Sequence, residues 1–494
     1  MTISNLLTDK LKDPTLATDK SLVGNAWLAT SQSGKTFEVT NPATGEVIAV
    51  LPDVNKTEVT KAIDAAHSAQ KAWAKKTGKE RAAILRKLND LMVANADDLA
   101  TILTMEMGKP WAEARGEILY GASYVEWFAE EAKRVYGDTI PGHQPDKRIM
   151  VIKQPVGVVG AITPWNFPNA MLARKVAPAL AVGCAMVSKP AAQTPLSALA
   201  LALLAERAGL PSGLFSVLTS TDAAMIGQEF CANDKVRKLT FTGSTNVGRI
   251  LMRQGADQIM KLGLELGGNA PFIVFDDADL DAAVEGAMIS KYRNAGQTCV
   301  CANRLYVQSG IYDAFAKKLA EKVSQLKVGD GFAEGVTTGP LIDANAVKKV
   351  KEHVADAVSK GAKVALGGSG ADAGELFFQP TILTGVTTDM KVASEETFGP
   401  VAPLFKFETE EEVIEMANAT EFGLASYFYS KDIAKIFRVA EALEYGMVGV
   451  NTGLISTEVA PFGGIKQSGL GREGSKYGID DYTEIKYICL GGIA

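Results

Sequence analysis

The alternation of hydrophobic and polar positions predicts strands followed by long helices in the first part of the chain. Apolar and polar residues alternate over positions 24–53, on either side of a turn-forming run at 41–46. This pattern predicts two strands joined by a turn. Apolar residues then recur about every 3.6 positions over 57–75 and 79–105, the spacing of an amphipathic helix. A third helix is expected over 112–135.

From about residue 156 onward, short apolar runs alternate with helical segments. The first series has expected strands at 158–162, 185–188, 215–218 and 238–242 and a helix at 194–208; the second has strands at 270–275 and 304–308 and helices at 279–295 and 312–325. This alternation is typical of parallel sheets covered by helices, so we predict an α/β fold. The boundary between the two series is expected near residues 266–269.

Two further strands are predicted outside both series, at 140–155 and 482–490. An exposed strand edge favours pairing with another strand. The partner strand belongs either to the same chain or to a second copy of it, and we expect pairing between subunits.

Length and charge exclude several classes of protein. A chain of 494 residues is too long for one hydrophobic core, so two large domains or about three smaller ones are expected. The net charge of −6 gives no basic surface for nucleic acid. No run reaches the roughly 18 apolar residues of a membrane span, and residues 1–20 lack the apolar core of a signal peptide. We therefore expect a cytoplasmic protein.

The scarcity of cysteine and histidine limits the chemistry. Five scattered cysteines do not form a disulfide framework, and no Cys/His group has zinc-ligand spacing, so no metal site is predicted. The three histidines, His67, His143 and His353, adjoin no chemical motif along the chain. A catalytic base is therefore expected to be a carboxylate.

One cysteine and one glutamate stand out as candidates for covalent catalysis. Cys299 lies in a polar run, Gly-Gln-Thr before it and Asn-Arg shortly after, whereas an inert cysteine is usually a small buried hydrophobe. Glu265 lies between two leucines and precedes two glycines, a setting unlike that of an ordinary surface carboxylate. Together they offer a nucleophile and a general base.

A glycine-containing turn between strand and helix offers a place for a phosphate. Residues 243–248 follow a predicted strand and open a helix, whose N-terminus can face a pyrophosphate. The run matches neither the dinucleotide fingerprint nor the P-loop, so the turn by itself is a weak signal.

Five motifs in order carry a resemblance to a known family. They are Pro164-Trp165-Asn166-Phe167-Pro168, Phe241-Thr242-Gly243-Ser244, Glu265-Leu266-Gly267-Gly268, Gly296-Gln297-Thr298-Cys299 and Glu395-Glu396-Thr397-Phe398-Gly399-Pro400. The sequence resembles the aldehyde dehydrogenase superfamily, and finer features resemble its succinate-semialdehyde dehydrogenase branch. The resemblance implies a Rossmann-like cofactor domain, an α/β catalytic domain and a small β oligomerisation arm. We expect these at 1–137 with 156–267, at 268–465, and at 138–155 with 478–494, respectively.

The resemblance also implies roles for the catalytic residues. Cys299 would attack an aldehyde to form a thiohemiacetal, whose oxyanion the Asn166 side chain and the Cys299 main-chain N–H would stabilise. Glu265 would activate the water that hydrolyses the resulting thioester. The resemblance makes a non-catalytic scaffold improbable, because these residues are all present. A cofactor-independent thioesterase is the other alternative.

The cofactor implied is NADP, with NAD also possible, and no metal is required. Lys189 and Ser188 would contact the adenosine ribose and its phosphate, and Ala192 stands where NAD-preferring relatives commonly place a glutamate that repels a 2′-phosphate. The remaining expected cofactor residues are Thr163, Trp165, Gly243, Ser244, Leu266, Glu396 and Phe398.

The substrate implied is an aldehyde with a carboxylate at its other end. Arg174, Arg293 and Ser456 match the carboxylate-binding set of succinate-semialdehyde dehydrogenases, and two guanidiniums suit a carboxylate. Either arginine by itself is more often a surface ion-pair partner. Succinic semialdehyde is the expected substrate, and glutaric semialdehyde is the alternative. A homo-oligomer, either dimer or tetramer, is expected. Cys301 is a candidate redox partner for Cys299, the alternative being a packed thiol.

Overall fold

Two large sheets organise the chain, which the computed structural model describes over residues 2–493. The first sheet has eight strands in the order β19-β11-β10-β7-β8-β9-β1-β2. Its strands are β1 (Ser21–Val23), β2 (Ala26–Leu28), β7 (Val158–Ile162), β8 (Ala185–Lys189), β9 (Phe215–Val217), β10 (Val236–Thr242), β11 (Lys261–Glu265) and β19 (Gly469–Leu470). The five central strands, β7 to β11, are parallel, and β1, β2 and β19 extend the sheet in antiparallel pairs.

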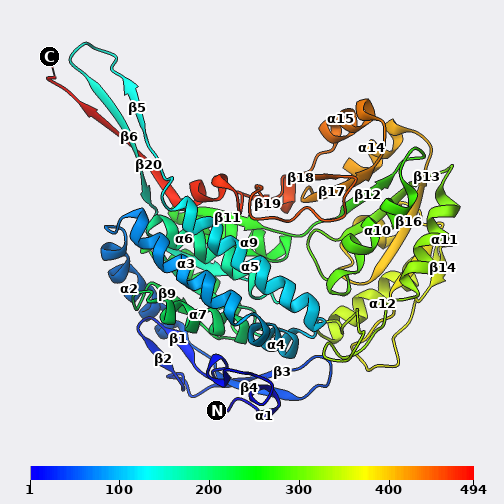
Figure 1. Ribbon diagram of the computed structural model, residues 1–494, viewed down its shortest axis with the longest axis horizontal. Helices are drawn as coiled ribbons and strands as arrows, with labels where there is room; N and C mark the ends of the chain where they lie inside the picture. The colour runs from blue at the N-terminus through cyan, green and yellow to red at the C-terminus, as the bar shows by residue number, and fades with distance from the viewer. Residues whose placement is uncertain (1, 494) are drawn as a thin grey trace.

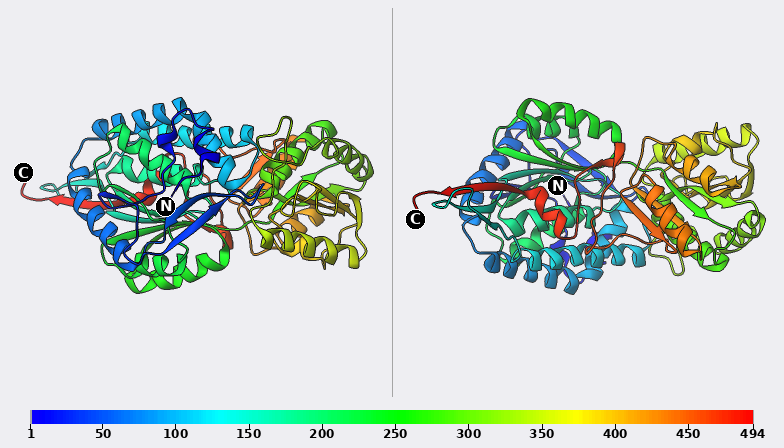
Figure 2. Two further views of the ribbon diagram at one scale, coloured as in Figure 1. Left: turned by 90° about the horizontal axis from the view of Figure 1, so that it is seen from below. Right: turned by 90° about the horizontal axis from the view of Figure 1, so that it is seen from above.

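Helices cover this first sheet on both sides (Figures 1 and 2). They are α2 (Lys56–Trp73), α3 (Gly78–Ala94), α4 (Ala96–Met107), α5 (Trp111–Glu131), α6 (Ala170–Val182), α7 (Leu196–Ala208), α8 (Ala223–Ala232) and α9 (Thr245–Gly255). The short α1 (Asn5–Thr8) and the hairpin of β3 (Thr36–Thr40) and β4 (Val47–Pro52) pack against α4. One continuous apolar core lies between the helices and the sheet.

The second sheet has seven strands in the order β14-β15-β16-β13-β12-β17-β18. They are β12 (Ala270–Val274), β13 (Ala302–Gln308), β14 (Lys363–Leu366), β15 (Thr381–Thr384), β16 (Val401–Phe407), β17 (Ala425–Tyr429) and β18 (Met447–Val450). All neighbours are parallel except β14 and β15. Its helices are α10 (Leu280–Tyr292), α11 (Tyr312–Val323), α12 (Ala344–Ser359), α13 (Lys391–Ser394), α14 (Glu410–Asn418) and α15 (Ile433–Ala442). The predicted α/β fold is thus confirmed.

The two strands predicted outside these series form a third, separate sheet. It consists of β5 (Asp138–Pro141), β6 (Arg148–Pro155) and β20 (Thr483–Leu490), in the order β20-β6-β5, with antiparallel pairing throughout. This sheet projects from the first half of the molecule on the side away from the second half (Figure 1). Within one chain, β20 pairs with β6, so part of each strand's hydrogen bonding is satisfied internally.

Two of the predicted helices were too long. The helix expected over 79–105 is broken at Asn95, which ends α3 and begins α4 with φ −105° and ψ 18°. The helix expected over 279–295 ends at Tyr292, because Asn294 and Ala295 adopt left-handed angles near φ 53°. An amphipathic pattern continues through such single-residue breaks, so periodicity does not show them.

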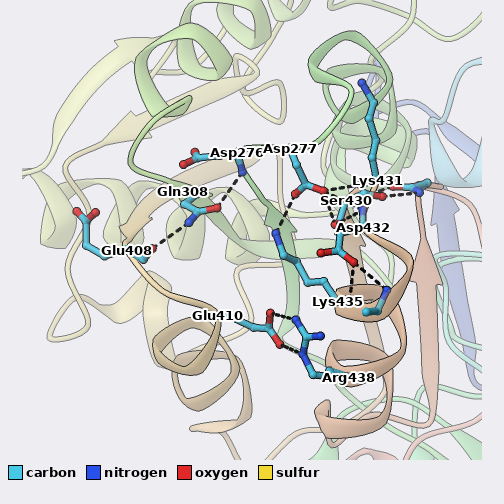
Figure 3. Close-up of polar contacts among 12 residues, drawn as sticks. Asp276, Asp277, Gln308, Glu408, Glu410, Ser430, Lys431, Asp432, Lys435 and Arg438 are labelled. Atoms are coloured by element: carbon cyan, nitrogen blue, oxygen red, sulfur yellow. Dashed lines mark hydrogen bonds and ion pairs between the residues drawn. The ribbon is translucent and has the colours of Figure 1, made fainter.

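A polar cluster fixes the outer corner of the second sheet, between β12 and α15 (Figure 3). One carboxylate oxygen of Asp277 accepts hydrogen bonds from the Ser430 hydroxyl and from the main-chain N–H groups of Lys431 and Asp432. Its other oxygen accepts from Lys435 Nζ at 3.0 Å. Burial favours a raised pKa for Asp277, but these bonds outweigh it and lower the pKa to about 2.

Candidate active site

A cavity of about 370 Å³ lies between the carboxyl ends of β7, β10 and β11 in the first sheet and the amino ends of β13 and β16 in the second, where the segments that carry Cys299 and Glu396 enter these strands. Parallel strands bring their carboxyl ends to one edge, and ligands of open α/β sheets bind there. Of the residues predicted from sequence, eleven line this cavity: Trp165, Asn166, Arg174, Gly243, Ser244, Leu266, Arg293, Cys299, Glu396, Phe398 and Ser456. Residues from separate motifs, far apart in the chain, therefore share one space.

The nucleophile candidate Cys299 lies on a tight loop between α10 and β13. Asn294 and Ala295 take left-handed angles there, and the N–H of Asn294 donates to Glu113 Oε2 at 2.8 Å. Gly296 has φ 74°, and a Cβ at this position would come within 2.2 Å of the Gly399 carbonyl oxygen, so only glycine fits. This packing holds Cys299 half-exposed at the cavity wall while its neighbours are buried.

Burial raises the pKa of the Cys299 thiol to about 12. Arg174 works against that effect, whereas Glu396 and Glu265 add to it. A thiol with so high a pKa is protonated at neutral pH, so a base has to accept its proton before it attacks.

Asn166 follows β7 and faces the Cys299 loop. Its Nδ2 donates to the main-chain oxygen of Gln297 at 3.0 Å, and its Oδ1 accepts from the N–H of Phe167 at 3.1 Å. The amide group carries two N–H bonds and one of them is used here, so a second donor remains. That donor and the Cys299 N–H are available to an oxyanion formed at Cys299.

Glu265 ends β11 and is buried, and unlike its neighbour Leu266 it is not among the residues that line the cavity. Its Oε2 makes no hydrogen bond within residues 2–493. Burial, reinforced by Glu473, raises the pKa of Glu265 well above its usual range, while Arg174 and Lys175 oppose the rise. A buried carboxyl with a raised pKa is suited to moving protons near neutral pH.

Arg174 has a strong partner that the sequence did not reveal. On α6, the guanidinium forms an ion pair with Glu473 and lies over the Phe462 ring at 4.1 Å. Lys175 forms a second ion pair with Glu473. Nη1 and Nη2 of Arg174 are buried without a hydrogen-bond partner in the described chain. The guanidinium therefore faces the cavity with unused donors, although Glu473 offsets part of its charge.

Arg293 and Ser456 approach the same part of the cavity from the second half of the molecule. Arg293 lies over one side of Phe167, with its guanidinium carbon 5.1 Å from the ring centre. The buried Lys109 also lies against this ring, with Nζ at 3.7 Å, and is paired with Glu117 at 2.6 Å. No ion pair to Arg293 occurs among residues 2–493, so its charge is available to a ligand.

The end of β8 supplies an unpaired cation. Lys189 is buried, forms no ion pair in the described part of the chain, and burial lowers its pKa to about 8. Ala192 lies half-buried shortly after it. The buried Ser188 hydroxyl donates to the Ser216 carbonyl at 2.8 Å, so its one donor is already engaged. Its contact with a cofactor phosphate stays a prediction.

Trp165, Glu396 and Phe398 form a further part of the cavity lining. Trp165 and Phe398 meet edge to face, with ring centres 5.6 Å apart. Glu396 Oε1 accepts from the N–H of Gly268 at 3.1 Å, and burial raises the pKa of Glu396 to about 7. Thr163, after β7, has a buried hydroxyl without a partner among the described residues.

Cys301 does not line the cavity. It is buried, and its sulfur lies 3.3 Å from Lys291 Nζ. Both Cys299 and Cys301 are free thiols. A disulfide between them would require the Cys301 sulfur to leave Lys291, so the redox role remains a prediction.

Several cavity residues were missed by sequence reasoning. The missed lining residues include Tyr120, Phe167, Met171, Phe462 and, from the start of α12, Ala346 and Lys349. Glu473, which pairs with Arg174 and Lys175, was missed as well. No local motif marks them. Of these residues, Phe167 alone stands inside a motif that the sequence analysis had singled out.

Comparison with known proteins gives consistent matches. Residues 27–488 match the aldehyde dehydrogenase family. The chain is 66% identical to a glutarate-semialdehyde dehydrogenase of Pseudomonas aeruginosa, over 98% of this chain and 100% of that one. It is 62% identical to the succinate-semialdehyde dehydrogenase [NADP(+)] GabD of Escherichia coli, over 98% and 100%.

A solved structure agrees with these matches. The crystal structure of succinate-semialdehyde dehydrogenase from Burkholderia pseudomallei superposes with a TM-score of 0.96 at 62% identity, covering 97% of this chain and 99% of that one. Within residues 2–493 there is no group of His, Cys, Asp or Glu able to hold a metal ion. None of the described helices is long and apolar enough to cross a membrane.

Proposed function

The chain belongs to the aldehyde dehydrogenase family, and from that premise we propose that it oxidises an aldehyde bearing a distal carboxylate, with NADP as oxidant. Succinic semialdehyde is the substrate we favour, and glutaric semialdehyde is the alternative. The observation that carries the proposal is one cavity lined by Cys299, Arg174 and Arg293 together. Charge-assisted bonds to a carboxylate are worth about 1.5–3 kcal/mol each, enough to select a charged aldehyde.

The residues present fit a dinucleotide. Within residues 2–493, Lys189 is a buried cation without an ion-pair partner and the Thr163 hydroxyl is buried without a hydrogen bond, so both would gain a partner in a ribose or phosphate. Gly243 and Ser244 form the turn at the N-terminus of α9, where Ser244 caps the helix. Ala192 leaves room for a 2′-phosphate without the repulsion of a carboxylate. When bound, NADP accepts the hydride.

The chain's own residues supply the rest of the proposed mechanism. Glu265 accepts the Cys299 proton, and the thiolate attacks the aldehyde carbon to form a thiohemiacetal. The second N–H of Asn166 and the Cys299 N–H stabilise its oxyanion. Loss of hydride leaves a thioester on Cys299. Glu265 gives that proton to solvent and then takes one from the water that attacks the thioester. It returns this second proton to the departing Cys299 sulfur, so that the carboxylic acid is released and the thiol is restored.

We also propose that each of the three sheets has its own function. The first sheet with its helices would bind the cofactor, the second would carry the nucleophile, and the projecting sheet would join subunits. Support for the last comes from large apolar side chains exposed on it: Ile485 is 72% and Tyr487 57% exposed. Light scattering after size-exclusion chromatography tests this: a monomer would overturn it.

The direct test is absorbance at 340 nm with purified protein. Succinic semialdehyde, glutaric semialdehyde and butanal are each supplied with NADP and with NAD. We expect both semialdehydes to exceed butanal in kcat/KM by at least about tenfold, from a single charge-assisted bond pair. Equal values for butanal would overturn the carboxylate assignment. Hydrolysis of a thioester without any reduction of NADP would favour a thioesterase instead.

A further inference from the structure

We propose that His353 is a positioning residue for the segment 395–398 and that it thereby controls how tightly the cofactor's nicotinamide end is held. The inference rests on the proposed function, because Glu396 and Phe398 in this segment border the cofactor end of the cavity. None of the three histidines adjoins a motif along the chain, but in space His353 contacts this one directly.

The contact is made by both ring nitrogens of a buried imidazole. His353 lies on α12 and is 1% exposed. Its Nδ1 is 3.1 Å from Thr397 Oγ1, and its Nε2 is 3.2 Å from Glu395 Oε2. Thr397 is itself 2% exposed. His353 thus bonds to the residues on either side of Glu396.

The partners determine which nitrogen carries the proton. A carboxylate only accepts hydrogen bonds, so Nε2 is the donor to Glu395, and Nδ1 accepts from the Thr397 hydroxyl in the neutral ring. Burial, together with Lys349, lowers the pKa of His353 despite the opposing effect of Glu395, so the neutral form is favoured. This arrangement uses every polar atom of the imidazole.

The segment has little main-chain hydrogen bonding to hold it: among the main-chain groups of residues 395–398 in the described chain, the Glu395 N–H donates to the Lys391 carbonyl. Phe398 takes a left-handed φ of 55°, which costs a residue with a side chain. The Glu396 side chain is bonded only to the Gly268 N–H within the described chain. Against α12 the segment also has an apolar contact, where the Val350 side chain packs so close to Gly399 that a Cβ there would come within 2.4 Å.

The same helix forms part of the cavity wall. Ala346 and Lys349 line the cavity, and His353 lies one turn beyond Lys349 on that side of α12. The imidazole therefore joins two walls of the cofactor end, the helix and the segment 395–398. Loss of the two His353 hydrogen bonds should weaken cofactor binding without altering the part of the cavity lined by Arg293 and Ser456.

The test compares three variants by titrating NADPH fluorescence in the absence of aldehyde. Thr397→Val keeps the shape of the side chain but removes its hydrogen bond to His353. His353→Gln keeps a donor toward Glu395, and His353→Leu removes the hydrogen bonds to both Glu395 and Thr397. Thr338→Val is the matched control, because the Thr338 hydroxyl is equally buried but has no partner among residues 2–493. We expect Kd for NADPH to rise about two- to tenfold in Thr397→Val and more in His353→Leu.

The remaining readouts separate positioning from folding. We expect His353→Gln to fall between wild type and His353→Leu, and the KM for aldehyde to change less than about twofold in all of them. A purely structural role would lower kcat through loss of active protein and leave Kd unchanged. Wild-type Kd in Thr397→Val and His353→Gln would overturn the inference, even where His353→Leu does not fold. Because binding is measured without aldehyde, a wrong substrate assignment does not affect this result.

Discussion

The side-chain amide of Asn166 donates to the main-chain oxygen of Gln297, 3.0 Å away, and so joins the end of β7 to the loop that carries Cys299. The two residues come from different halves of the molecule. The bond aims the amide at the nucleophile before any substrate arrives, and preorganised donors of this kind stabilise a developing oxyanion most effectively.

Replacement of Asn166 by Ala should therefore act on the chemical step. We expect kcat to fall by about 10²–10³-fold, the usual cost of one oxyanion donor, with NADPH binding within twofold of wild type. Steady-state kinetics and fluorescence titration measure the two quantities. Asn345→Ala is the control, because Asn345 is an amide side chain that lines the same cavity from the start of α12. An equal loss in both variants would contradict the role of Asn166.

The second prediction concerns substrate charge. Arg293→Ala should raise KM for succinic semialdehyde by about 10–100-fold, because a carboxylate loses one charge-assisted partner, and should leave KM for butanal nearly unchanged. Arg293 is preferable to Arg174 for this test, since removing Arg174 would also leave Glu473 with one partner fewer. Arg237→Ala, on the exposed side of β10, controls for net charge. Similar effects on both aldehydes would refute the assignment.

The sequence predicted the sheets and many of the residues that line the cavity, but it did not predict the residues that form ion pairs with them. Alternating strands and helices are local features, and the motifs at the strand ends fall at one edge because the strands are parallel. The ion pair of Lys175 with Glu473, in contrast, joins residues 298 positions apart. Neither hydrophobic periodicity nor a motif encodes such a contact.

The sequence also did not show to which face of a strand a given side chain points. Ser188 and Lys189 are neighbours in β8, and successive side chains of a strand point to opposite faces. Lys189 is the unpaired cation, whereas Ser188 bonds to Ser216 inside the sheet. The break at Asn95 and the left-handed Asn294 depend in the same way on packing with distant segments, which local propensity does not represent.

The Asp277 cluster allows a prediction about stability (Figure 3). The folded pKa of about 2 lies below the usual unfolded value of about 3.9, so the carboxylate contributes stability that is complete above about pH 5 and is lost as pH falls toward 2. Asp277→Asn should lower the melting temperature by about 2–4 °C at pH 7, and the difference from wild type should fall to about half by pH 3.

Thermal scans at several pH values check the Asp277 prediction. Asp276→Asn is the matched control. Asp276 is the neighbouring residue, and its carboxylate takes no part in the hydrogen bonds to Ser430, Lys431 and Lys435. If the difference in melting temperature between wild type and Asp277→Asn stays constant from pH 7 to pH 3, Asp277 contributes through its shape and not through its charge.

Cys299 should react slowly with alkylating agents in the cofactor-free protein. With a pKa of about 12, its thiolate fraction grows about tenfold with each pH unit, so alkylation by iodoacetamide should rise steadily from pH 7 to pH 10. Peptide mass spectrometry follows position 299 separately from the exposed Cys489. A rate that levels off by pH 8 would mean that the thiol is activated before the cofactor binds.

The choice between NADP and NAD should depend on the residue at position 192. A carboxylate there would accept the ribose 2′-hydroxyl of NAD and repel the 2′-phosphate of NADP. Ala192→Glu should thus lower kcat/KM for NADP by about 10–100-fold, a cost of about 1.4–2.7 kcal/mol, and keep or improve the value for NAD. Ala191→Glu adds the same charge one residue earlier in the half-buried turn and serves as the control. If the two variants reduce NADP turnover equally, the discrimination arises from general charge around Lys189, and the particular role given to Ala192 is wrong.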